Sequence, residues 1–199
     1  MQGHARKSRY TCESMRFSLP PPGVEAVLLA LVLCAAVYDV RYRRIPNWLT
    51  VTGVLAGLAL NGFLDQGRQG LFVSSLLGLG IAFAVYFVLY LLRAMGAGDV
   101  KLMAAVGAVV GWPNWFGIFI ITAILGGIMA LILVVARGRV KKTFWNVAFI
   151  LGELKGGRPA YMGREELDVK SPKALGLPHG AVIAVGTLFF LAISTHFTR

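Results

Sequence analysis

The stretch MGAGDVKLM, residues 95–103, places an aspartate and a lysine between two long apolar runs and introduces them with two glycines. No Asp, Glu, Lys or Arg occurs in residues 71–92, just before this stretch, or in residues 102–136, just after it. About 20 consecutive apolar residues are enough to cross a bilayer as an α-helix. Asp99 and Lys101 therefore stand at the junction of predicted membrane spans, where a charged side chain is costly and indicates a function.

The composition of the whole chain predicts a membrane protein. Of its 199 residues, 57% are hydrophobic and 15% are charged, which is outside the balance of a soluble globular domain. The run 102–136 is too long for one ordinary crossing, and Gly111-Trp112-Pro113-Asn114 supplies turn residues, so we interpret it as two spans. We expect an all-α fold, a polytopic membrane helical bundle of about six transmembrane helices.

The predicted spans are residues 26–38, extended outward through 17–23, and then 48–64, 71–92, 100–111, 115–136 and 177–197. We expect an N-terminal tail (1–23) and a single transmembrane domain (24–199) that includes a cytoplasmic loop (137–176). Within this loop, apolar residues at helical spacing predict a helix in the membrane interface or one packed on the bundle: Phe144, Val147, Ala148, Leu151 and Leu154. Residues 156–172 read as a linker or lid.

The charge distribution predicts the orientation. The net charge is +11, but the basic residues gather in loops between spans instead of forming a nucleic-acid-binding face, so the expected partner is the lipid bilayer and not nucleic acid. If Asp39 lies on the cytoplasmic side, fourteen of the twenty Lys and Arg residues lie in cytoplasmic loops. Four basic residues of the tail oppose the rule, and a translation start at Met15 would remove three of them. Nothing in the pattern indicates an oligomeric state.

Two aspartates belong to the same side of the membrane. Asp39 ends the first span and Asp99 opens the fourth, and counting crossings puts both on the cytoplasmic side. About twelve residues separate Asp99 from Trp112, which covers about 18 Å of a roughly 30 Å core. If Trp112 and Trp115 mark the outer interface, Asp99 lies below the inner one. Two such carboxyl groups in reach of one another share one proton, so that one activates water while the other polarises a peptide carbonyl.

This chemistry needs no metal, serine or thiol. Cys12 and Cys34 form neither a disulfide framework nor a zinc site, the histidines (His4, His179 and His196) are scattered, and no cofactor or metal is expected. Gly96 and Gly98 leave room beside Asp99 for an extended substrate, and Lys101 could orient a carboxylate. Glycines spaced four apart, Gly53 with Gly57 and Gly107 with Gly111, carry little functional weight in a chain with 24 glycines.

Each residue also has a simpler interpretation. Asp39 alone could pair with the arginines at positions 41, 43 and 44, and Asp99 alone could be a helix N-cap. Pro46-Asn47 alone is a turn before a helix. Their joint occurrence at one face favours a site.

The motifs resemble a known family. DVRYRRIPNWLT (39–50), followed by GAGDVKLMAAVGAVVGW (96–112), resembles the type IV prepilin peptidases, whose members carry Asp, a basic stretch and Ile-Pro-Asn, then Gly-x-Gly-Asp-x-Lys. LPHGAVIAVG (177–186) resembles the family's Pro-Tyr-Gly segment, with His179 where tyrosine is more usual. The resemblance covers about residues 26–186.

The resemblance implies an aspartic endopeptidase, multi-pass in the bacterial inner membrane, with Asp39 and Asp99 as the catalytic pair at the cytoplasmic face. Pro46, Asn47, Gly96, Gly98, Lys101, Pro178 and Gly180 are then motif residues that support substrate binding or structure. The implied substrates are prepilins or pseudopilins, which carry a short basic leader before an apolar helix. Longer members add a domain with two Cys-x-x-Cys pairs and N-methylate the product, so the resemblance implies a short form without methylation, as at tight-adherence (Flp) pilus loci.

Two other classes stay open from the sequence. Carboxylates within the membrane also carry protons in transporters, although no internal repeat is apparent and both aspartates lie toward one face. A non-catalytic membrane subunit of a pilus or secretion assembly, in which the aspartates serve helix packing, is the other alternative.

Overall fold

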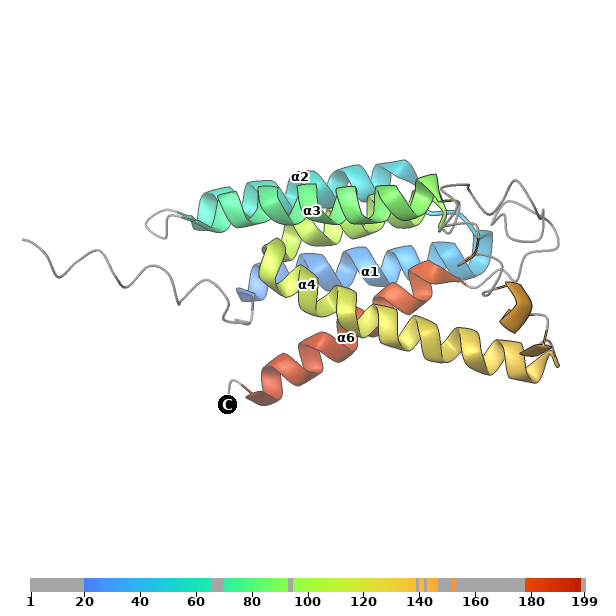
Figure 1. Ribbon diagram of the computed structural model, residues 1–199. Coiled ribbons are helices and arrows are strands. Elements are labelled where there is room, and N and C mark those ends of the chain that lie inside the picture. The colour runs from blue at the N-terminus through green and yellow to red at the C-terminus, as the bar shows by residue number, and fades with distance from the viewer. Residues whose placement is uncertain are drawn as a thin grey trace, which may run out of the picture.

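The computed structural model describes residues 20–65, 70–92, 95–138, 140–141, 143–146, 152 and 178–197. Its main elements are α1 (Pro22–Tyr42), α2 (Asn47–Leu64), α3 (Leu71–Leu91), α4 (Ala97–Ala136) and α6 (His179–Phe197) (Figure 1). All five are long and apolar enough to cross a membrane. This confirms the predicted all-α, polytopic membrane bundle. The tail before residue 20, the linker 156–172 and most of the predicted loop helix lie outside the described residues.

α4 contains the division predicted within the run 102–136. Gly111 has φ 76° and ψ 168°, a backbone conformation that side chains disfavour and glycine allows. The chain reverses there: the first half of α4 (97–110) runs toward the end of the molecule where α3 begins, and the second half (112–136) runs back (Figure 1). Pro113 sits in the first turn of the second half, where a missing N–H costs nothing. The six predicted spans therefore correspond to five helices, of which α4 provides two crossings.

The first half of α4 is the centre of the bundle. Every residue from 102 to 111 is buried, and α1, α2, α3 and α6 all contact α4. The sequence explains this position, because LMAAVGAVVG is apolar or small on every side and a helix that is hydrophobic all round is stable only when surrounded. Packing of this segment fixes the place of Asp99, which lies in the same helix one turn earlier.

Glycines let neighbouring helices approach this central segment. Gly78 in α3 and Gly107 in α4 face one another so closely that a Cβ on either would overlap the backbone carbonyl of the other. A Cβ on Gly57 in α2 would lie 2.8 Å from the backbone nitrogen of Val109. The glycine spacings, which carry little weight in the sequence, are therefore structural contacts of the kind that membrane helices use to pack.

Asn61 in α2 supports the end of this central segment. Its side-chain Nδ2 donates to the Val109 carbonyl at 2.9 Å, and it also contacts the Ala108 carbonyl at 3.4 Å. The last carbonyls of a helix have no partner within the helix, and in an apolar environment an unpaired carbonyl is costly. Asn61 thus stabilises the C-terminal end of the first half of α4, just before Gly111.

Trp115, one of the two tryptophans expected near the outer interface, packs inside the bundle. Trp115 is 1% exposed and stacks on Phe119 with ring centroids 5.4 Å apart, so it belongs to the core. Burial describes how Trp115 packs and not the depth at which it lies in a membrane, so the placement of the outer interface at Trp112 and Trp115 stays a prediction. At the opposite end of the bundle, Tyr42 and Trp48 are exposed and contact Tyr38, as aromatic residues do at an interface.

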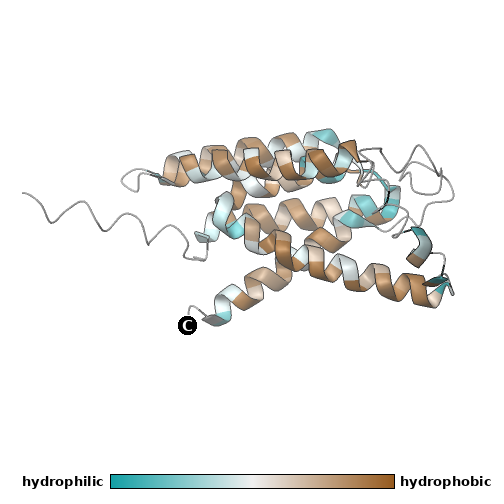
Figure 2. Ribbon diagram, viewed as in Figure 1, coloured by the Kyte–Doolittle hydropathy of each residue, from teal (hydrophilic) through white to brown (hydrophobic). Residues whose placement is uncertain are grey.

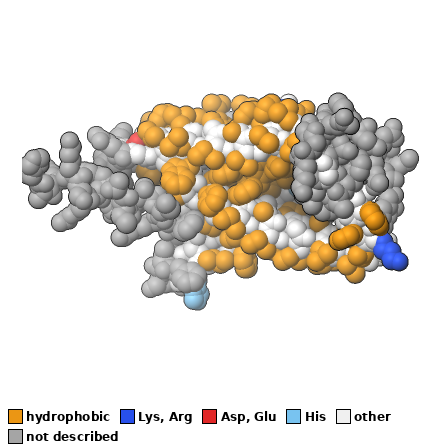
Figure 3. Space-filling view, in the orientation of Figure 1, with side chains coloured by type: hydrophobic (Ala, Val, Ile, Leu, Met, Phe, Trp, Pro, Cys, Tyr) orange, Lys and Arg blue, Asp and Glu red, His pale blue; other side chains and the backbone are white. Residues whose placement is uncertain are grey.

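The surface agrees with a bilayer as surroundings. Hydrophobic side chains cover the face seen in Figure 3 along the length of the helices, and the coloured charged side chains lie at the two ends. Colouring by hydropathy gives the same distribution: the helices are mainly brown along their lengths, and teal concentrates at their ends (Figure 2). The ends of the bundle therefore carry the groups that suit water and lipid headgroups.

Candidate active site

Asp39 lies in the last turn of α1 and is 8% exposed. The sequence predicts that Asp39 ends the first span, but the helix continues to Tyr42 and ends at Arg43, whose left-handed backbone (φ 54°) closes it. The Asp39 side-chain Oδ2 accepts a hydrogen bond of 2.7 Å from the backbone N–H of Gly180 in α6. A surface ion pair with its own helix end therefore does not account for Asp39, because its carboxylate is turned inward to another helix.

Gly180 permits a close approach at this contact. A Cβ at this position would lie 3.0 Å from both Cβ and Oδ2 of Asp39, closer than nearly all real Cβ contacts. Gly180 is also the second residue of α6, whose first N–H groups have no partner within the helix. The Asp39 carboxylate satisfies one of these donors, and the partial positive charge of the α6 N-terminus stabilises a carboxylate there.

Asp99 lies in the first turn of α4, three residues after the N-cap Gly96. Its carboxylate accepts a hydrogen bond from the backbone N–H of Gly96, and its own N–H donates to the Gly96 carbonyl at 3.2 Å. This is the acidic half of a capping box. The alternative that Asp99 is itself the N-cap is wrong, because Gly96 occupies that position.

The two sequence motifs meet in space. Lys101 Nζ donates a hydrogen bond of 2.9 Å to Asn47 Oδ1, which joins the Gly-x-Gly-Asp-x-Lys motif to the Ile-Pro-Asn motif. Pro46 is the N-cap of α2 and Asn47 its first residue. Next to this contact, a Cβ on Gly98 would lie 3.3 Å from Cβ of Ile45, so the missing side chain lets the start of α4 approach the start of α2.

Asp39, Asp99 and His179 form one electrostatic group. The Asp99 carboxylate interacts with the imidazole of His179 and with the carboxylate of Asp39. These residues come from three helices: the end of α1, the start of α4 and the start of α6. The structure thus places both predicted carboxylates at the same end of the bundle, within electrostatic reach of one another.

Three helix N-termini converge on this end of the bundle. α2 begins at Asn47, α4 at Ala97 and α6 at His179, and these starts are linked to one another through Lys101, Asp39 and Asp99. Helix N-termini carry unpaired N–H groups and a partial positive charge, which favour anions. Such a site can hold two carboxylates close together. It can also stabilise negative charge that develops on an oxygen atom of a bound, reacting group.

Sequence reasoning missed two members of this group. His179 was counted among scattered histidines, yet it interacts electrostatically with Asp99. Tyr86 in α3 is buried and also interacts electrostatically with Asp99. Tyr86 had a recognisable signal, because it is a polar group within the apolar run 71–92 and a buried tyrosine usually hydrogen-bonds through its hydroxyl. His179 had one too, since it directly precedes Gly180.

The fold and the site define a class of protein: a membrane-embedded helical bundle with two inward-facing carboxylates from different helices at one end. The chain belongs to the type IV leader peptidase family. The model of this family matches residues 26–131, which are more than half of the chain. No solved structure matches significantly.

Similar curated proteins include a prepilin leader peptidase/N-methyltransferase of Escherichia coli (strain K12), 29% identical over 69% of this chain and 62% of that protein. Another of this name, from Myxococcus xanthus (strain DK1622), is 28% identical over 57% of this chain and 35% of its own length. A preflagellin peptidase of Methanocaldococcus jannaschii is 32% identical over 40% of this chain and 34% of its own. The match thus spans about a third to three fifths of these relatives.

Proposed function

We propose that the chain is an aspartic endopeptidase that removes the leader from prepilins or pseudopilins at the cytoplasmic face of the bacterial inner membrane. The observation that carries the proposal is that the carboxylates of Asp39 and Asp99, from two helices, lie within electrostatic reach of one another, with Asp39 buried against the start of α6. Capping of α4 explains the hydrogen bond between Gly96 and the Asp99 carboxylate. It does not explain why the Asp39 carboxylate of α1 lies within electrostatic reach of Asp99.

In the proposed reaction one carboxylate takes a proton from water while the other, protonated, donates its proton to the carbonyl oxygen of the scissile peptide bond. The hydroxide oxygen bonds to the carbonyl carbon and gives a tetrahedral diol. The first carboxyl group then returns its proton to the amide nitrogen, the C–N bond breaks, and the second carboxylate recovers a proton from the diol. The products are a leader with a new carboxyl group and a mature protein with a free amine.

The motif residues are proposed to hold this geometry. The Lys101–Asn47 hydrogen bond and the Gly98–Ile45 approach fix the start of α4, and hence Asp99, against α2. Gly180 fixes the start of α6 against Asp39, and the Pro178 carbonyl accepts the Val182 N–H in the first turn of that helix. None of these groups needs to touch the substrate to affect cleavage, because misplacement of a catalytic carboxylate by about 1 Å lowers the reaction rate strongly.

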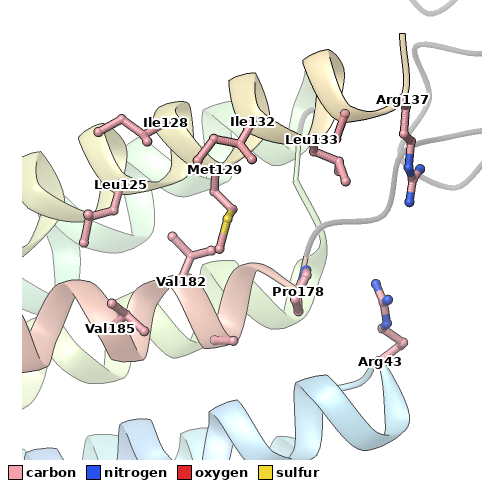
Figure 4. A pocket seen from close by; sticks show the side chains of 12 residues that line it. Arg43, Leu125, Ile128, Met129, Ile132, Leu133, Arg137, Pro178, Val182 and Val185 are labelled. Atoms are coloured by element: carbon pink, nitrogen blue, oxygen red, sulfur yellow. The ribbon is translucent and has the colours of Figure 1, made fainter. Parts of the chain in front are cut away.

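Charge supports the cytoplasmic placement of the site. The end of α1 that carries Asp39 also carries Arg41 and Arg43, and the second half of α4 ends at Arg137 on the same end of the molecule (Figure 4). Arginine-rich ends lie in the cytoplasm by the positive-inside rule. A leader peptidase acts where a polar leader meets an apolar segment, and we expect Asp39 and Asp99 to lie at this level.

We also propose that the product is not N-methylated. The 199 residues contain Cys12 and Cys34 as their only cysteines, so they hold no Cys-x-x-Cys pair of the kind that accompanies methylation in the longer members. The proposal is independent of the cleavage step.

One experiment tests both points. The full chain, purified in detergent, is incubated with a prepilin from the organism that encodes it, and the product is examined by mass spectrometry. We expect a single cut at the junction of leader and apolar segment and an unmodified new N-terminus, also in the presence of S-adenosylmethionine. An intact prepilin, together with Asp99-dependent proton flux in proteoliposomes, would instead favour the transport alternative.

A further inference from the structure

The buried residues of α3 lie along one face of that helix, and Tyr86 is the last of them. They are Ser75, Gly78, Ala82 and Tyr86, spaced three or four positions apart, so they form one stripe. Gly78 places this stripe against the first half of α4, where it meets Gly107. Tyr86 therefore lies on the side of α3 that faces α4, and its side chain is 2% exposed.

The register of the two helices brings Tyr86 level with Asp99. α3 and the first half of α4 run in opposite directions (Figure 1) and meet where Gly78 faces Gly107. Tyr86 lies eight residues after Gly78, and Asp99 lies eight residues before Gly107, so each is about two turns from the same contact. The electrostatic interaction between Tyr86 and Asp99 agrees with this register.

The ring of Tyr86 is fixed by packing, whereas its hydroxyl has no partner. The ring packs edge-on against Phe119 in the second half of α4, with centroids 5.9 Å apart. Within the described part of the chain the hydroxyl forms no hydrogen bond, although it interacts electrostatically with the Asp99 carboxylate. A buried tyrosine hydroxyl normally has a partner, so this one calls for an explanation. Near a catalytic carboxylate the explanation is a reacting group, because catalytic hydrogen bonds often form only when substrate is bound.

The proposed reaction contains one oxygen atom that needs such a donor. The carbonyl oxygen of the scissile bond gains negative charge as water attacks, and it becomes a hydroxyl group of the diol. A donor beside the carboxyl group that protonates this oxygen stabilises the developing charge, most strongly in a site from which water is excluded. A phenol suits this role because it keeps its own proton at neutral pH.

We propose that Tyr86 is a third catalytic residue, whose hydroxyl donates a hydrogen bond to the scissile carbonyl oxygen when that oxygen is bound at Asp99. The inference rests on the proposed function and adds a residue to its site. Tyr86 keeps its proton throughout, so the proton transfers between water, the two carboxyl groups and the substrate are unchanged. Because the hydrogen bond is strongest in the transition state, its loss lowers kcat and leaves KM unchanged.

Tyr86→Phe tests this inference, because it removes the hydroxyl and keeps the ring that packs on Phe119. On a prepilin in proteoliposomes we expect kcat to fall about a hundredfold, the effect of removing one donor to a developing oxyanion, with KM unchanged. Tyr90→Phe is the matched control and should cleave like the wild type. Tyr90 lies one turn further along α3 and stacks on Phe87 with ring centroids 6.2 Å apart.

A wild-type kcat for Tyr86→Phe would overturn the inference and leave the proposed function intact. If the wild type does not cleave the prepilin, the proposed function fails, and the inference fails with it.

A binding measurement separates a hydrogen bond to the reacting oxygen from a role in packing. The probe is a peptide of the prepilin junction in which a hydroxyethylene group replaces the scissile amide, so that its hydroxyl takes the place of a diol oxygen. We expect Tyr86→Phe to weaken binding of this peptide about tenfold, as for one hydrogen bond, and to leave unchanged the binding of the same peptide without that hydroxyl. An equal loss for both peptides would assign Tyr86 to packing and overturn the inference.

A second variant covers the case in which Tyr86→Phe does not fold. With 4-methylphenylalanine at position 86, a methyl group fills the space of the hydroxyl but cannot donate a hydrogen bond. This variant is expected to keep the wild-type thermal stability in detergent and to lose kcat about a hundredfold. A wild-type kcat in this variant would overturn the inference.

Discussion

The backbone N–H of Gly180 donates a 2.7 Å hydrogen bond to Oδ2 of Asp39, and this contact joins the last turn of α1 to the first turn of α6. The C-terminal turn of a helix is an unfavourable place for a carboxylate, because the carbonyl ends carry partial negative charge. The N-terminus of α6 offsets that effect with a donor and a partial positive charge. Asp39 is therefore held by a helix that is distant in sequence, and its position depends on the absence of a side chain at Gly180.

Gly180→Ala is expected to lower kcat by roughly ten- to a hundredfold, because the new Cβ would lie 3.0 Å from Asp39 Cβ and push that carboxylate out of place. The measurement is the initial rate of prepilin cleavage, with detergent-solubilised thermal stability recorded beside it. Gly80→Ala is the control, since nothing lies within 4 Å of the added Cβ. A Gly180→Ala enzyme with the wild-type rate would show that Asp39 does not depend on this contact.

The hydrogen bond between Lys101 and Asn47 is expected to couple these residues in catalysis. Lys101→Met and Asn47→Ala each remove the same contact, so each should lower the cleavage rate and the double variant should be no worse than the poorer single one. A double-mutant cycle on kcat/KM measures this coupling. Lys141→Met, at an exposed basic residue, controls for loss of charge. Effects that multiply would mean that the two side chains act separately.

Gly57→Ala is expected to destabilise the bundle by about 1–3 kcal/mol, because its Cβ would meet the backbone of α4, which cannot rotate away. Gly62→Ala in the same helix meets only a Phe72 ring carbon at 3.5 Å and should be neutral or slightly stabilising. Denaturant titration in mixed micelles gives both free energies of unfolding. Equal values for the two variants would contradict the close approach of α2 and α4.

The helices could be predicted closely because charges and turn residues bracket the apolar runs. α2 begins at Asn47, one residue before the predicted start, and α3 ends at Leu91, one before the predicted end. The first helix begins at Pro22, before the predicted run 26–38, and includes Glu25, because an acidic residue is favourable within a first turn. The division at Gly111 was predictable because a run of that length must turn.

The contacts between motifs could not be predicted in the same way. Counting crossings puts Asp39 and Asp99 on one side of the membrane, but it does not state which helices are neighbours. That arrangement follows from the glycine approaches around the first half of α4, such as Gly78 with Gly107, which are ordinary spacings in a glycine-rich sequence. For the same reason His179 appeared isolated in the sequence, although α6 packs against α1 and α4.

The cleavage rates of Asp39→Asn, Asp99→Asn and the double variant test the central claim most directly, since residues that act on one water as a unit have strongly non-additive effects. Measured on one prepilin in proteoliposomes, each single variant is expected to lose cleavage to the detection limit while remaining folded, and the double variant to behave like either single one. A single variant that cleaves at the wild-type rate would contradict the account, because the reaction would then not need both carboxylates.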